Sequence, residues 1–451
     1  MSTSSSNTIA VLGGGISGLS IAWFLKKKGF EVTLFEAYKK TGGVIRSTSN
    51  EYSVFDFGPN TIRDKTGSVS EMVTELALEN EALSISESSK MRYIVRNGEL
   101  KKIDQNPFSF LLSDVLSWKG KKELFVEPLK KRLKSDADES IGLFLERRIG
   151  KEAVDYLADP FFSGIYAGDI YSMSKQKLIG KLADFEQEYG SISKGFLKSR
   201  KEKSSFKPRV ISFKKGVQQL TNELAEDLSE QIKFERVDQL KFGDSQFQIK
   251  TEQNSYEFDI VVNCLPAYAL EKILDTDHKD LKKSLSEISY PSMLSTQLVF
   301  KKEDLNLPEK GFGFLVPRKE NRRLLGAIWK SNIFPEQTME EFVHVNLMTG
   351  GAHDSVISDA NIEEVEEEVL AEFKQIMKTG AHPVTVSSKK WKHSIPQFKV
   401  GYDETDSLFN EFESAHRGIH IGGNFRWGIS VADCVEGAKG LADTISKQKI
   451  F

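Results

Sequence analysis

Three glycines near the N-terminus have a spacing that can bind a diphosphate. Gly13, Gly15 and Gly18 form the pattern G-x-G-x-x-G in "VLGGGISGLS". The first glycine permits a tight turn, the second lets a pyrophosphate approach the backbone, and the third lets a helix pack closely on a strand. The N–H groups at the start of that helix favour phosphate oxygens. The turn therefore predicts a dinucleotide-binding set of Gly13, Gly14, Gly15, Ile16, Ser17 and Gly18.

An acidic residue follows this turn at a suitable distance. Glu36 stands 18 residues after Gly18, where a second strand is expected to end. A carboxylate at this point accepts hydrogen bonds from the hydroxyls of an adenosine ribose and repels a 2′-phosphate. The motif thus favours FAD or NAD over NADP. The alternative, a tight turn without a ligand, is disfavoured because strand, turn and helix occur together.

The hydrophobic pattern supplies the elements that must position these residues. Residues 8–12 and 31–35 are expected to be strands, and residues 17–28 a helix, which together make one βαβ unit. Alternating strands and helices recur over 210–265, residues 290–349 are rich in strand patterns, and 362–378 form an amphipathic helix. This alternation predicts an α/β protein with a Rossmann-like unit.

A second glycine-rich turn lies at the other end of the chain. Residues 421–442 read "IGGNFRWGISVADCVEGAKGLA", with glycines directly before an expected helix. A glycine turn that opens a helix can stabilise an anion or a dipole. Two such turns in one chain need a common explanation.

Composition excludes several classes of protein. The 451 residues carry a net charge of −3 and are 39% hydrophobic, as in an ordinary globular protein of two or three domains. The charge balance lacks the basic excess that is typical of nucleic-acid-binding proteins. Cys264 and Cys434 form no CxxC or Cys/His cluster, so we expect a reducing compartment and no metal site. The N-terminus has no signal-peptide pattern, and no apolar run reaches the ~20 residues of a membrane span.

The block 105–204 differs from the rest of the chain. It is mostly helical in pattern, carries clustered lysines and ends in the polar stretch "KSRKEKSSFKP". Within it, residues 106–134 join an apolar, aromatic segment to a basic one. This composition is typical of an amphipathic helix on an anionic bilayer, or of a lobe whose apolar face covers a cavity.

A second glycine pair follows Glu36 and narrows the choice of cofactor. The stretch contains Thr41, Gly42 and Gly43, and then "FDFGPNTI" at 55–62. This combination resembles FAD enzymes of the amine-oxidase type. The resemblance implies that non-covalent FAD also contacts Gly42, Gly43, Val44, Arg46, Gly58, Pro59, Asn60 and Thr61.

The central stretch 159–169 points to one family of these enzymes. It reads "DPFFSGIYAGD" and resembles the FAD-dependent, oxygen-using protoporphyrinogen and coproporphyrinogen oxidases. By itself it would be a packing motif between two lobes. Further similar stretches occur in order: "FKKGVQQL", "GFGFLVP", "LLGAIWKSNIFPEQ", "NLMTGG", "SIPQFKVGY" and "GGNFRWGISVADCVEG". The resemblance covers nearly the whole chain.

The resemblance implies a domain arrangement that explains the two glycine turns. The C-terminal segment folds back onto the N-terminal unit, so that both turns contact one FAD. The implied parts are a discontinuous FAD-binding domain, an inserted α+β substrate domain and a helical, membrane-associating lobe. Their boundaries are 6–84, 205–282 and 415–451 for the first, 85–104 and 283–414 for the second, and 105–204 for the third.

The resemblance also implies further site residues. The backbone of Val237 would meet the adenine, and the isoalloxazine ring would lie near Asn424, Ile429, Ser430 and Val431. Arg92 would bind a substrate propionate, because a guanidinium can engage a carboxylate at two points. The macrocycle would be lined by Phe312, Gly313, Leu315, Ile328 and Met348.

The expected activity is the oxidation of protoporphyrinogen IX to protoporphyrin IX by hydride transfer to FAD, with O₂ reduced to hydrogen peroxide. No side chain stands out as a general base. Family precedent adds a homodimer, hand-over to a chelatase, and a cytoplasmic location with peripheral contact to the cytoplasmic membrane face. Coproporphyrinogen III oxidation remains an alternative that the sequence does not exclude.

Other enzyme classes fit the sequence less well, and two positions need comment against the family pattern. A flavin amine oxidase can attach FAD through a C-terminal cysteine, but Cys434 falls inside the expected final helix. A carotenoid-type desaturase lacks the 159–169 stretch, and a non-catalytic porphyrin carrier would reduce no oxygen. Val44 stands where animal relatives carry tryptophan. Arg426 is interpreted as a surface residue rather than a second propionate partner.

Overall fold

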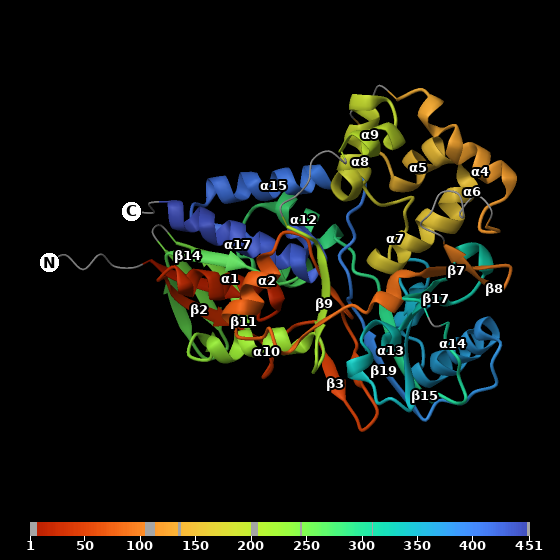
Figure 1. The fold of residues 1–451 in the computed structure, drawn as a ribbon. Coiled ribbons are helices and arrows are strands. Elements are labelled where there is room, and N and C mark those ends of the chain that lie inside the picture. The colour runs from red at the N-terminus through yellow and green to blue at the C-terminus, as the bar shows by residue number, and fades with distance from the viewer. Residues whose placement is uncertain are drawn as a thin grey trace.

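The chain folds into three parts. The structure, a computed structural model, describes residues 7–103, 113–133, 137–199, 206–243, 246–308 and 310–448. Figure 1 shows a parallel-sheet unit on the left, a unit around a seven-stranded sheet on the lower right, and a helical lobe above the latter.

The parallel-sheet unit is built on five parallel strands. Ile9 and Val11 face one side of the sheet, and Ala10 and Leu12 face the other. Because both faces are covered, the central strand is apolar from Ile9 to Leu12. In spatial order the strands are β10 (Ile232–Lys233), β2 (Glu31–Phe35), β1 (Thr8–Leu12), β14 (Ile260–Asn263) and β20 (Ile419–Ile421).

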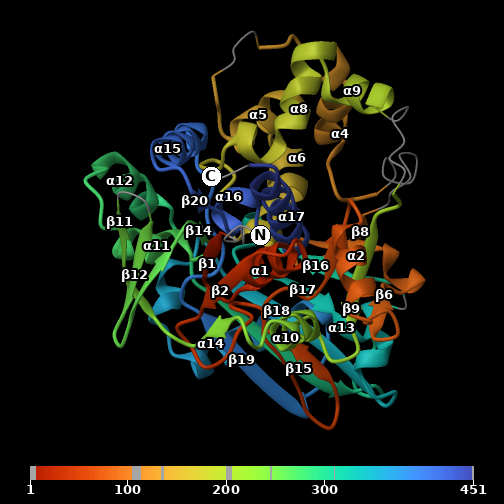
Figure 2. The same ribbon diagram turned by 90° about the vertical axis from the view of Figure 1, so that its left-hand side faces the viewer.

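Helices cover both faces of this sheet. On one face lie α1 (Ile16–Lys27), α2 (Ser68–Glu75), α10 (Gln218–Asp227) and α17 (Val431–Lys447). On the other lie α11 (Ala267–Ile273), α12 (Lys279–Glu287), α15 (Tyr402–Ala415) and a small sheet of β11 (Val237–Phe242), β12 (Phe247–Thr251) and β13 (Ser255–Phe258). Helices α1 and α17 pack side by side (Figures 1 and 2), so an N-terminal and a C-terminal helix share one layer. The predicted βαβ unit is confirmed.

The second part is a seven-stranded sheet. All of its neighbouring strands are antiparallel except β16 and β7, which run parallel. The spatial order is β19 (Thr385–Trp391), β15 (Met293–Lys301), β18 (Phe342–Gly350), β17 (Leu324–Trp329), β16 (Gly313–Leu315), β7 (Arg92–Arg96) and β8 (Glu99–Ile103).

The two faces of the seven-stranded sheet have different partners. Helix α14 (Ile362–Met377) packs on one face against an apolar core that includes Phe314, Ala327 and Leu347. Side chains alternate along a strand, so the residues next to these point to the opposite face. That opposite face reaches toward the parallel-sheet unit, where Asp56 O accepts a hydrogen bond from Gln297 Nε2 at 2.9 Å. The amphipathic helix predicted for 362–378 is confirmed.

The helical lobe has its own core and a buried ionic cluster. Arg148 is fully buried and donates hydrogen bonds to Glu127 and Glu186. Its helices are α4 (Trp118–Phe125), α5 (Ile141–Ile149), α6 (Lys151–Ala153), α7 (Asp159–Tyr166), α8 (Lys175–Tyr189) and α9 (Ile192–Ser199), with a π-helical stretch at Val154–Ala158. The prediction of a helical lobe is confirmed.

The segment predicted as an amphipathic helix over 106–134 is interrupted. Helix α4 ends at Phe125, and a short 3₁₀ turn follows at Glu127–Leu129. Pro128 explains the break, because proline cannot donate the backbone hydrogen bond that would continue α4. Residues 104–112 and 134–136 lie outside the described residues. No helix in the described ranges is both long enough and apolar enough to cross a membrane.

Short elements connect the three parts. They are the strands β3 (Ser47–Ser49), β4 (Val54–Asp56), β5 (Ile62–Asp64), β6 (Ala82–Ser84) and β9 (Arg209–Phe213), the helices α13 (Lys330–Ile333) and α16 (Asn424–Trp427), and the 3₁₀ turns Glu87–Lys90, Arg318–Glu320, Pro335–Gln337 and Ser355–Ser358.

Candidate active site

The first glycine turn has the geometry of a phosphate cradle. Gly13 has φ +101°, a conformation that side chains disfavour. A Cβ on Gly18 would lie 1.8 Å from Gly13 O, so only glycine lets α1 pack this close to the turn. Gly15 precedes α1 without a side-chain cap, and the first turn of α1 carries no acidic residue. The N–H groups at this helix end can therefore bind an anion.

Glu36 lies beside this turn as its spacing predicts. Its carboxylate is 8% exposed and follows directly after β2. Oε2 accepts a hydrogen bond from Gly14 N at 2.8 Å, and Oε1 accepts one from Tyr38 N at 2.8 Å. Two backbone donors thus fix the carboxylate at the edge of the turn, where it can still accept hydrogen bonds from hydroxyl groups.

The second glycine pair packs against the first turn, backbone to backbone. Gly42 N donates to Gly14 O at 2.7 Å, and a Cβ on Gly43 would lie 3.2 Å from the Cα of Gly15. A Cβ on Gly58 would approach the carbonyl oxygen of Val44 to 2.2 Å. Three separate segments of the chain therefore meet without side chains between them.

Arg46 holds the loop that carries this pair. Its Nη1 donates to the carbonyl oxygen of Thr41, and its Nη2 donates to that of Lys40 at 3.4 Å. Burial lowers the pKa of Arg46, and the nearby charge of Glu36 opposes this effect. These contacts give Arg46 a role in loop geometry in addition to its predicted role toward the cofactor.

The N-terminal and C-terminal glycine turns meet at one strand end. A Cβ on Gly13 would lie 3.2 Å from the carbonyl carbon of Cys264, and a Cβ on Gly423 would lie 3.7 Å from the Cα of Cys264. Cys264 follows β14, the neighbour of both β1 and β20. The two turns therefore lie on either side of the same residue at the carboxyl edge of the parallel sheet, where ligands of such sheets bind.

The second turn leads into a capped helix. Ser430 precedes α17, and its Oγ accepts a hydrogen bond from Asp433 N at 3.0 Å. Ile429 and Ser430 are half-buried, Val431 is buried, and Asn424 opens the short helix α16. Helix α17 thus starts at the same sheet edge as α1, so two helix ends point their N–H groups into one region.

Arg426, in the same segment, is engaged by α15. Its Nη1 lies 2.9 Å from Glu413 Oε1, and its Nη2 donates to Asn410 Oδ1 at 2.7 Å. The side chain is 15% exposed. Its interpretation as a surface residue was therefore wrong, because it is a half-buried ion-pair partner that fixes the turn to α15.

The predicted substrate residues gather on neighbouring strands of the seven-stranded sheet. Gly313 pairs with Ile328, and Leu315 and Met348 both pair with Gly326. An apolar cluster joins Phe312, Ile328 and Met348 to Leu83, Ile333 and Phe334. The predicted substrate residues, which lie up to 36 positions apart in the sequence, therefore form one apolar wall.

The packing of two neighbouring strands requires glycine at position 313. It has φ +145°, and a Cβ there would lie 1.9 Å from the carbonyl oxygen of Ala327. The close approach of β16 and β17 thus already demands glycine. Leu315 reaches the helical lobe, because a Cβ on Gly164 of α7 would lie 2.7 Å from its side chain.

Arg92 stands at the edge of this wall. Its guanidinium lies over the ring of Phe312, with 4.2 Å between Cζ and the ring centre. Nη1 donates to Ser89 O at 2.6 Å and to Met91 O at 3.2 Å. No carboxylate pairs with Arg92 among the described residues, so the side chain, which is exposed, keeps a charge that an acidic ligand can use.

Val237 lies apart from these contacts. It starts β11, four residues after β10, and pairs with Thr251. Strand β10 itself approaches the glycine turn, because Lys233 O accepts a hydrogen bond from Glu36 N at 2.9 Å. Val237 thus follows shortly after the strand that contacts Glu36 at the edge of the parallel sheet.

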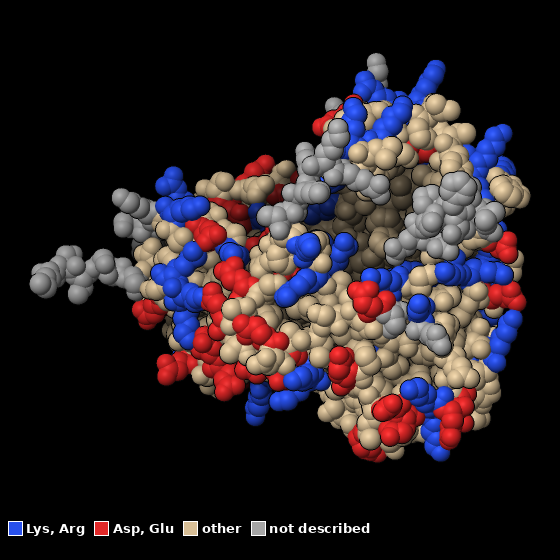
Figure 3. Space-filling model, in the orientation of Figure 1, with Lys and Arg blue, Asp and Glu red and all other residues tan. Residues whose placement is uncertain are grey.

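The molecular surface is hollowed below the helical lobe. In Figure 3 the visible wall of this hollow consists mainly of residues other than Lys, Arg, Asp and Glu, with basic side chains along its lower rim. An apolar hollow with cations at its mouth suits a large apolar ligand that carries carboxylates.

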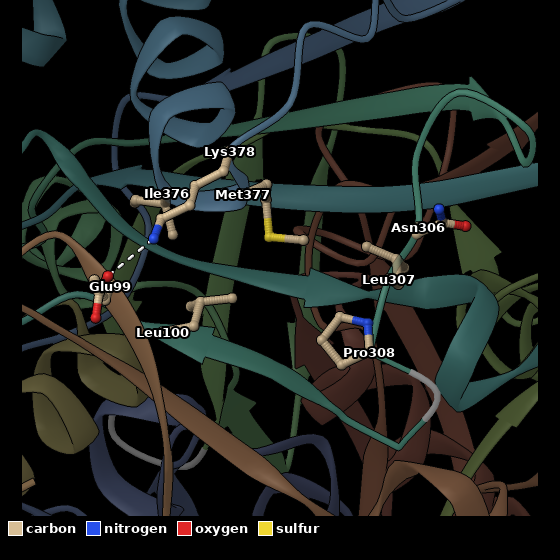
Figure 4. A pocket seen from close by; sticks show the side chains of 8 residues that line it. All are labelled: Glu99, Leu100, Asn306, Leu307, Pro308, Ile376, Met377 and Lys378. Carbon is tan, nitrogen blue, oxygen red and sulfur yellow. Dashed lines mark hydrogen bonds and ion pairs between the residues drawn. The ribbon is translucent and has the colours of Figure 1, made fainter. Parts of the chain in front are cut away.

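Another pocket, of about 480 Å³, lies elsewhere (Figure 4). It is formed by β8, by α14 and by the loop at 306–308, and the ion pair between Lys378 and Glu99 crosses it at 2.9 Å. None of the predicted site residues lines it. Its position is separate from the glycine turns and from Arg92.

Sequence reasoning missed a row of buried polar residues beside the apolar wall. Asn346 pairs with Ile328 in the sheet, and Gln297 pairs with Asn346. Both side chains are buried, as is His344, two residues before Asn346. The signal was the alternation in "FVHVNLMTG", which places His344, Asn346 and Met348 on one face.

The comparisons with known proteins agree with this arrangement. Residues 16–446 match the model of the family of flavin containing amine oxidoreductases. The chain belongs to this family, and it is an oxidoreductase with FAD as its cofactor.

Among curated proteins, the chain is 29% identical to the mitochondrial protoporphyrinogen oxidase of Nicotiana tabacum, over 98% of this chain and 95% of the relative. It is 25% identical to the coproporphyrinogen III oxidase of Bacillus subtilis, over 96% of each. Solved structures show the same fold. A protein from Exiguobacterium sp. 255-15 has a TM-score of 0.85 at 21% identity, covering 98% of this chain and 99% of that one. Putrescine oxidase bound to putrescine has a TM-score of 0.72 at 15% identity, covering 98% and 99%.

Proposed function

We propose that this protein oxidises a porphyrinogen to a porphyrin, with protoporphyrinogen IX as substrate and protoporphyrin IX as product. The named relatives support this substrate class, because they match the chain over nearly its full length. The observation in this structure that carries the proposal is the pairing of Arg92 with Phe312 at the edge of an apolar wall. A tetrapyrrole with propionates needs both features.

FAD fits the glycine cradle of the parallel-sheet unit. Gly13 to Gly18 would hold the diphosphate, Glu36 the ribose, and the start of α17 the isoalloxazine ring, where its N–H groups favour negative charge. The same proposal assigns cofactor contacts to Gly42, Gly43, Val44, Arg46, Gly58, Pro59, Asn60, Thr61, Val237, Asn424, Ile429, Ser430 and Val431. When bound, FAD supplies the redox chemistry, a two-electron oxidation repeated three times per porphyrin with O₂ as acceptor and hydrogen peroxide as product.

The substrate-binding role belongs to the seven-stranded sheet. Arg92 would hold a propionate, and the wall of Phe312, Gly313, Leu315, Ile328 and Met348 would hold the macrocycle and keep water from its reacting face. The chain's contribution to the reaction is thus orientation and exclusion of water. The proposal keeps the boundaries expected from the sequence. Residues 6–84, 205–282 and 415–451 would bind FAD, and residues 85–104 and 283–414 would bind the substrate.

Coproporphyrinogen III is the second candidate substrate. The Bacillus subtilis relative favours it, and this substrate carries propionates where protoporphyrinogen IX carries vinyl groups. The two substrates therefore differ in the number of carboxylates that the basic rim of the hollow must bind. An amine substrate is the third candidate, favoured only by the shared fold of putrescine oxidase.

The test is porphyrin fluorescence in air after the purified protein receives freshly reduced protoporphyrinogen IX or coproporphyrinogen III. Faster enzyme-dependent fluorescence with one substrate identifies the reaction. Hydrogen peroxide formation is followed in parallel, with putrescine as the amine substrate. A protein that binds FAD but oxidises neither porphyrinogen would refute the proposal, and peroxide formed from the amine would replace it.

The helical lobe is the proposed membrane contact. It exposes large apolar side chains, among them Trp118, Phe125, Leu129, Phe196 and Leu197, next to several lysines. This combination favours an anionic bilayer surface. Co-sedimentation with vesicles containing phosphatidylserine tests it. Binding that the pair Trp118→Ser and Leu129→Ser removes supports the proposal, and no binding at low salt refutes it.

Three further expectations follow from the resemblance to the family. They are a homodimer, hand-over of the product to a chelatase, and a cytoplasmic location with peripheral contact to the membrane. Sedimentation velocity of the FAD-bound protein tests the first of these, with a single species of monomer mass as the refuting result.

A further inference from the structure

A continuous row of hydrogen bonds links the seven-stranded sheet to the segment expected to lie under the flavin. It runs through Gln297, Ser295 and Asn346 to Asn60. These four side chains are each no more than 8% exposed. The row therefore lies between the proposed substrate wall and the proposed cofactor platform, and no function has been assigned to its three sheet residues.

The direction of every hydrogen bond in the row follows from the backbone carbonyls of Asp56 and Gly58, which lie at its two ends and can only accept. Asp56 O can only accept, so the group that faces it at 2.9 Å must be Nε2 of Gln297. The same Nε2 donates to Ser295 Oγ at 3.0 Å, and Ser295 Oγ then donates to Asn346 Oδ1 at 2.9 Å. Asn346 Nδ2 in turn donates to Asn60 Oδ1 at 3.1 Å.

The other side of Gln297 is consistent with this direction. Its Oε1 faces Nε2 of His344 at 2.8 Å, so His344 carries its proton on Nε2. Nδ1 of His344 then accepts from Ser53 Oγ, 2.7 Å away, whose one proton is shared with Gln337 O at 3.0 Å. Burial, together with the charge of Lys330, lowers the pKa of His344, which keeps the imidazole neutral. A neutral His344 with this tautomer holds the Gln297 amide in one orientation.

Hydrogen bonds at both polar atoms of the Asn60 amide fix its orientation. Its Oδ1 accepts from Asn346, and its Nδ2 donates to Gly58 O at 3.3 Å. In the described part of the chain this is the one bond that Nδ2 donates, so a second N–H remains for a ligand. Without Asn346, only the 3.3 Å bond to Gly58 O would resist a rotation of the Asn60 amide that presents its carbonyl oxygen in place of the N–H.

We infer that Asn346 is a positioning residue that orients the Asn60 amide, so that Asn60 presents an N–H donor to the flavin. A donor stabilises the negative charge that reduction places on a flavin, whereas a carbonyl oxygen repels it. The inference rests on the proposed placement of FAD over Gly58 to Thr61. It adds to the proposed function a side chain that lies on the substrate strand β18 and acts on the cofactor through Asn60.

The test uses Asn346→Leu, which has a similar volume and no polar group. We expect FAD to bind about 3- to 10-fold more weakly, the size of one hydrogen bond. The midpoint potential of the bound flavin should become more negative, as measured by reduction with an indicator dye. The control is Thr349→Val, because the hydroxyl of Thr349, on the same strand, is buried and without a hydrogen-bond partner among the described residues.

A double-mutant cycle with Asn60→Ala separates positioning from a structural effect. If Asn346 acts through Asn60, then Asn346→Leu shifts the potential in the wild-type background but not in the Asn60→Ala background. Equal shifts in both backgrounds, or no shift in either, overturn the inference. Asn346→Thr is the second variant, and it decides the outcome if the leucine variant fails to fold.

These measurements need no porphyrinogen. A wild-type protein that binds FAD but oxidises no porphyrinogen would refute the proposed substrate and leave the inference about Asn346 open to the same measurement. A potential that does not respond to Asn346→Leu in an active enzyme would refute the inference and leave the proposed function intact.

Discussion

The guanidinium of Arg92 lies 4.2 Å from the centre of the Phe312 ring, and the two residues come from segments 220 positions apart in the chain. A guanidinium over an aromatic face is held in place. Nη1 of Arg92 already donates to two backbone carbonyls, so Nε and Nη2 are the groups that a ligand can engage. The pair therefore presents a fixed cation directly beside an apolar surface.

Arg92→Ala should lower kcat/KM for a porphyrinogen by about 10- to 100-fold, because a hydrogen bond to a charged group contributes about 1.5–3 kcal/mol. The loss should appear mainly as a higher KM. Initial rates of porphyrin fluorescence over a range of substrate concentrations measure it. Arg63→Ala is the control, since Arg63 is exposed on β5. An unchanged KM in Arg92→Ala would remove Arg92 from the substrate site.

Gly18→Ala should prevent the first glycine turn from forming properly. The added Cβ would lie 1.8 Å from Gly13 O, a backbone atom that cannot turn away as a side chain can. We expect a loss of at least about 2 kcal/mol in the free energy of unfolding and FAD binding weakened at least about tenfold. Thermal unfolding and titration with FAD, followed by quenching of its fluorescence, measure both.

Gly440→Ala is the matched control for this variant. Gly440 lies in α17, and nothing comes within 4 Å of a Cβ placed there. Alanine in a helix interior is about 0.5–1 kcal/mol more favourable than glycine, so this variant should be slightly more stable and bind FAD normally. If both substitutions lower stability and FAD affinity equally, then the effect of Gly18→Ala is not specific to the close contact with Gly13 O.

The glycine turns illustrate what the sequence could predict. A local motif such as Gly13 to Gly18 has a fixed geometry that its spacing reveals, and Glu36 followed from the same motif. The expected helix near 17–28 and strands at 8–12 and 31–35 agree with α1, β1 and β2 to within one residue. A short apolar run such as β1, which is buried on both faces, indicates a strand of a parallel sheet.

The polar row on β15 and β18 shows what the sequence could not predict. Asn346 and Gln297 are 49 positions apart, and their contact depends on strand pairing that no local pattern encodes. Arg426 was misjudged for a related reason, since its partner Glu413 lies on α15 and the two meet only through the tertiary fold. Apolar residues such as Phe312 and Met348 were identified through family resemblance, because in isolation they read as sheet core.

FAD should be bound without a covalent link. Cys434 is 2% exposed on α17, and burial raises the pKa of its thiol to about 12. A buried thiol that stays protonated is a poor nucleophile for attachment to a flavin. Acid precipitation of the yellow protein should therefore leave all of the flavin in the supernatant. A yellow pellet would indicate a covalent bond, and loss of that colour in Cys434→Ser would identify the attachment point.

Asp159 should make the protein less stable as the pH rises. Its side chain is 5% exposed at the start of α7, and Oδ1 has no hydrogen-bond partner among the described residues. Burial raises its pKa to about 6, with a further contribution from the nearby charge of Asp169 and opposition from Arg318. In the unfolded chain an aspartate has a pKa of about 3.9. Between these two values the folded state binds more protons than the unfolded state, so stability falls with rising pH and stays low above about 6.

Asp159→Asn should remove this pH dependence while keeping the shape of the side chain. At pH 7 the variant should be more stable than the wild type by about 2 kcal/mol, and near pH 4 the difference should vanish. Urea unfolding at several pH values measures it. Asp184→Asn on the exposed side of α8 is the control and should leave the profile unchanged. If Asp159→Asn is less stable than the wild type at pH 7, then the carboxylate of Asp159 is stabilised in the folded state, and the stretch 159–169 has a role beyond packing between the lobe and the sheet.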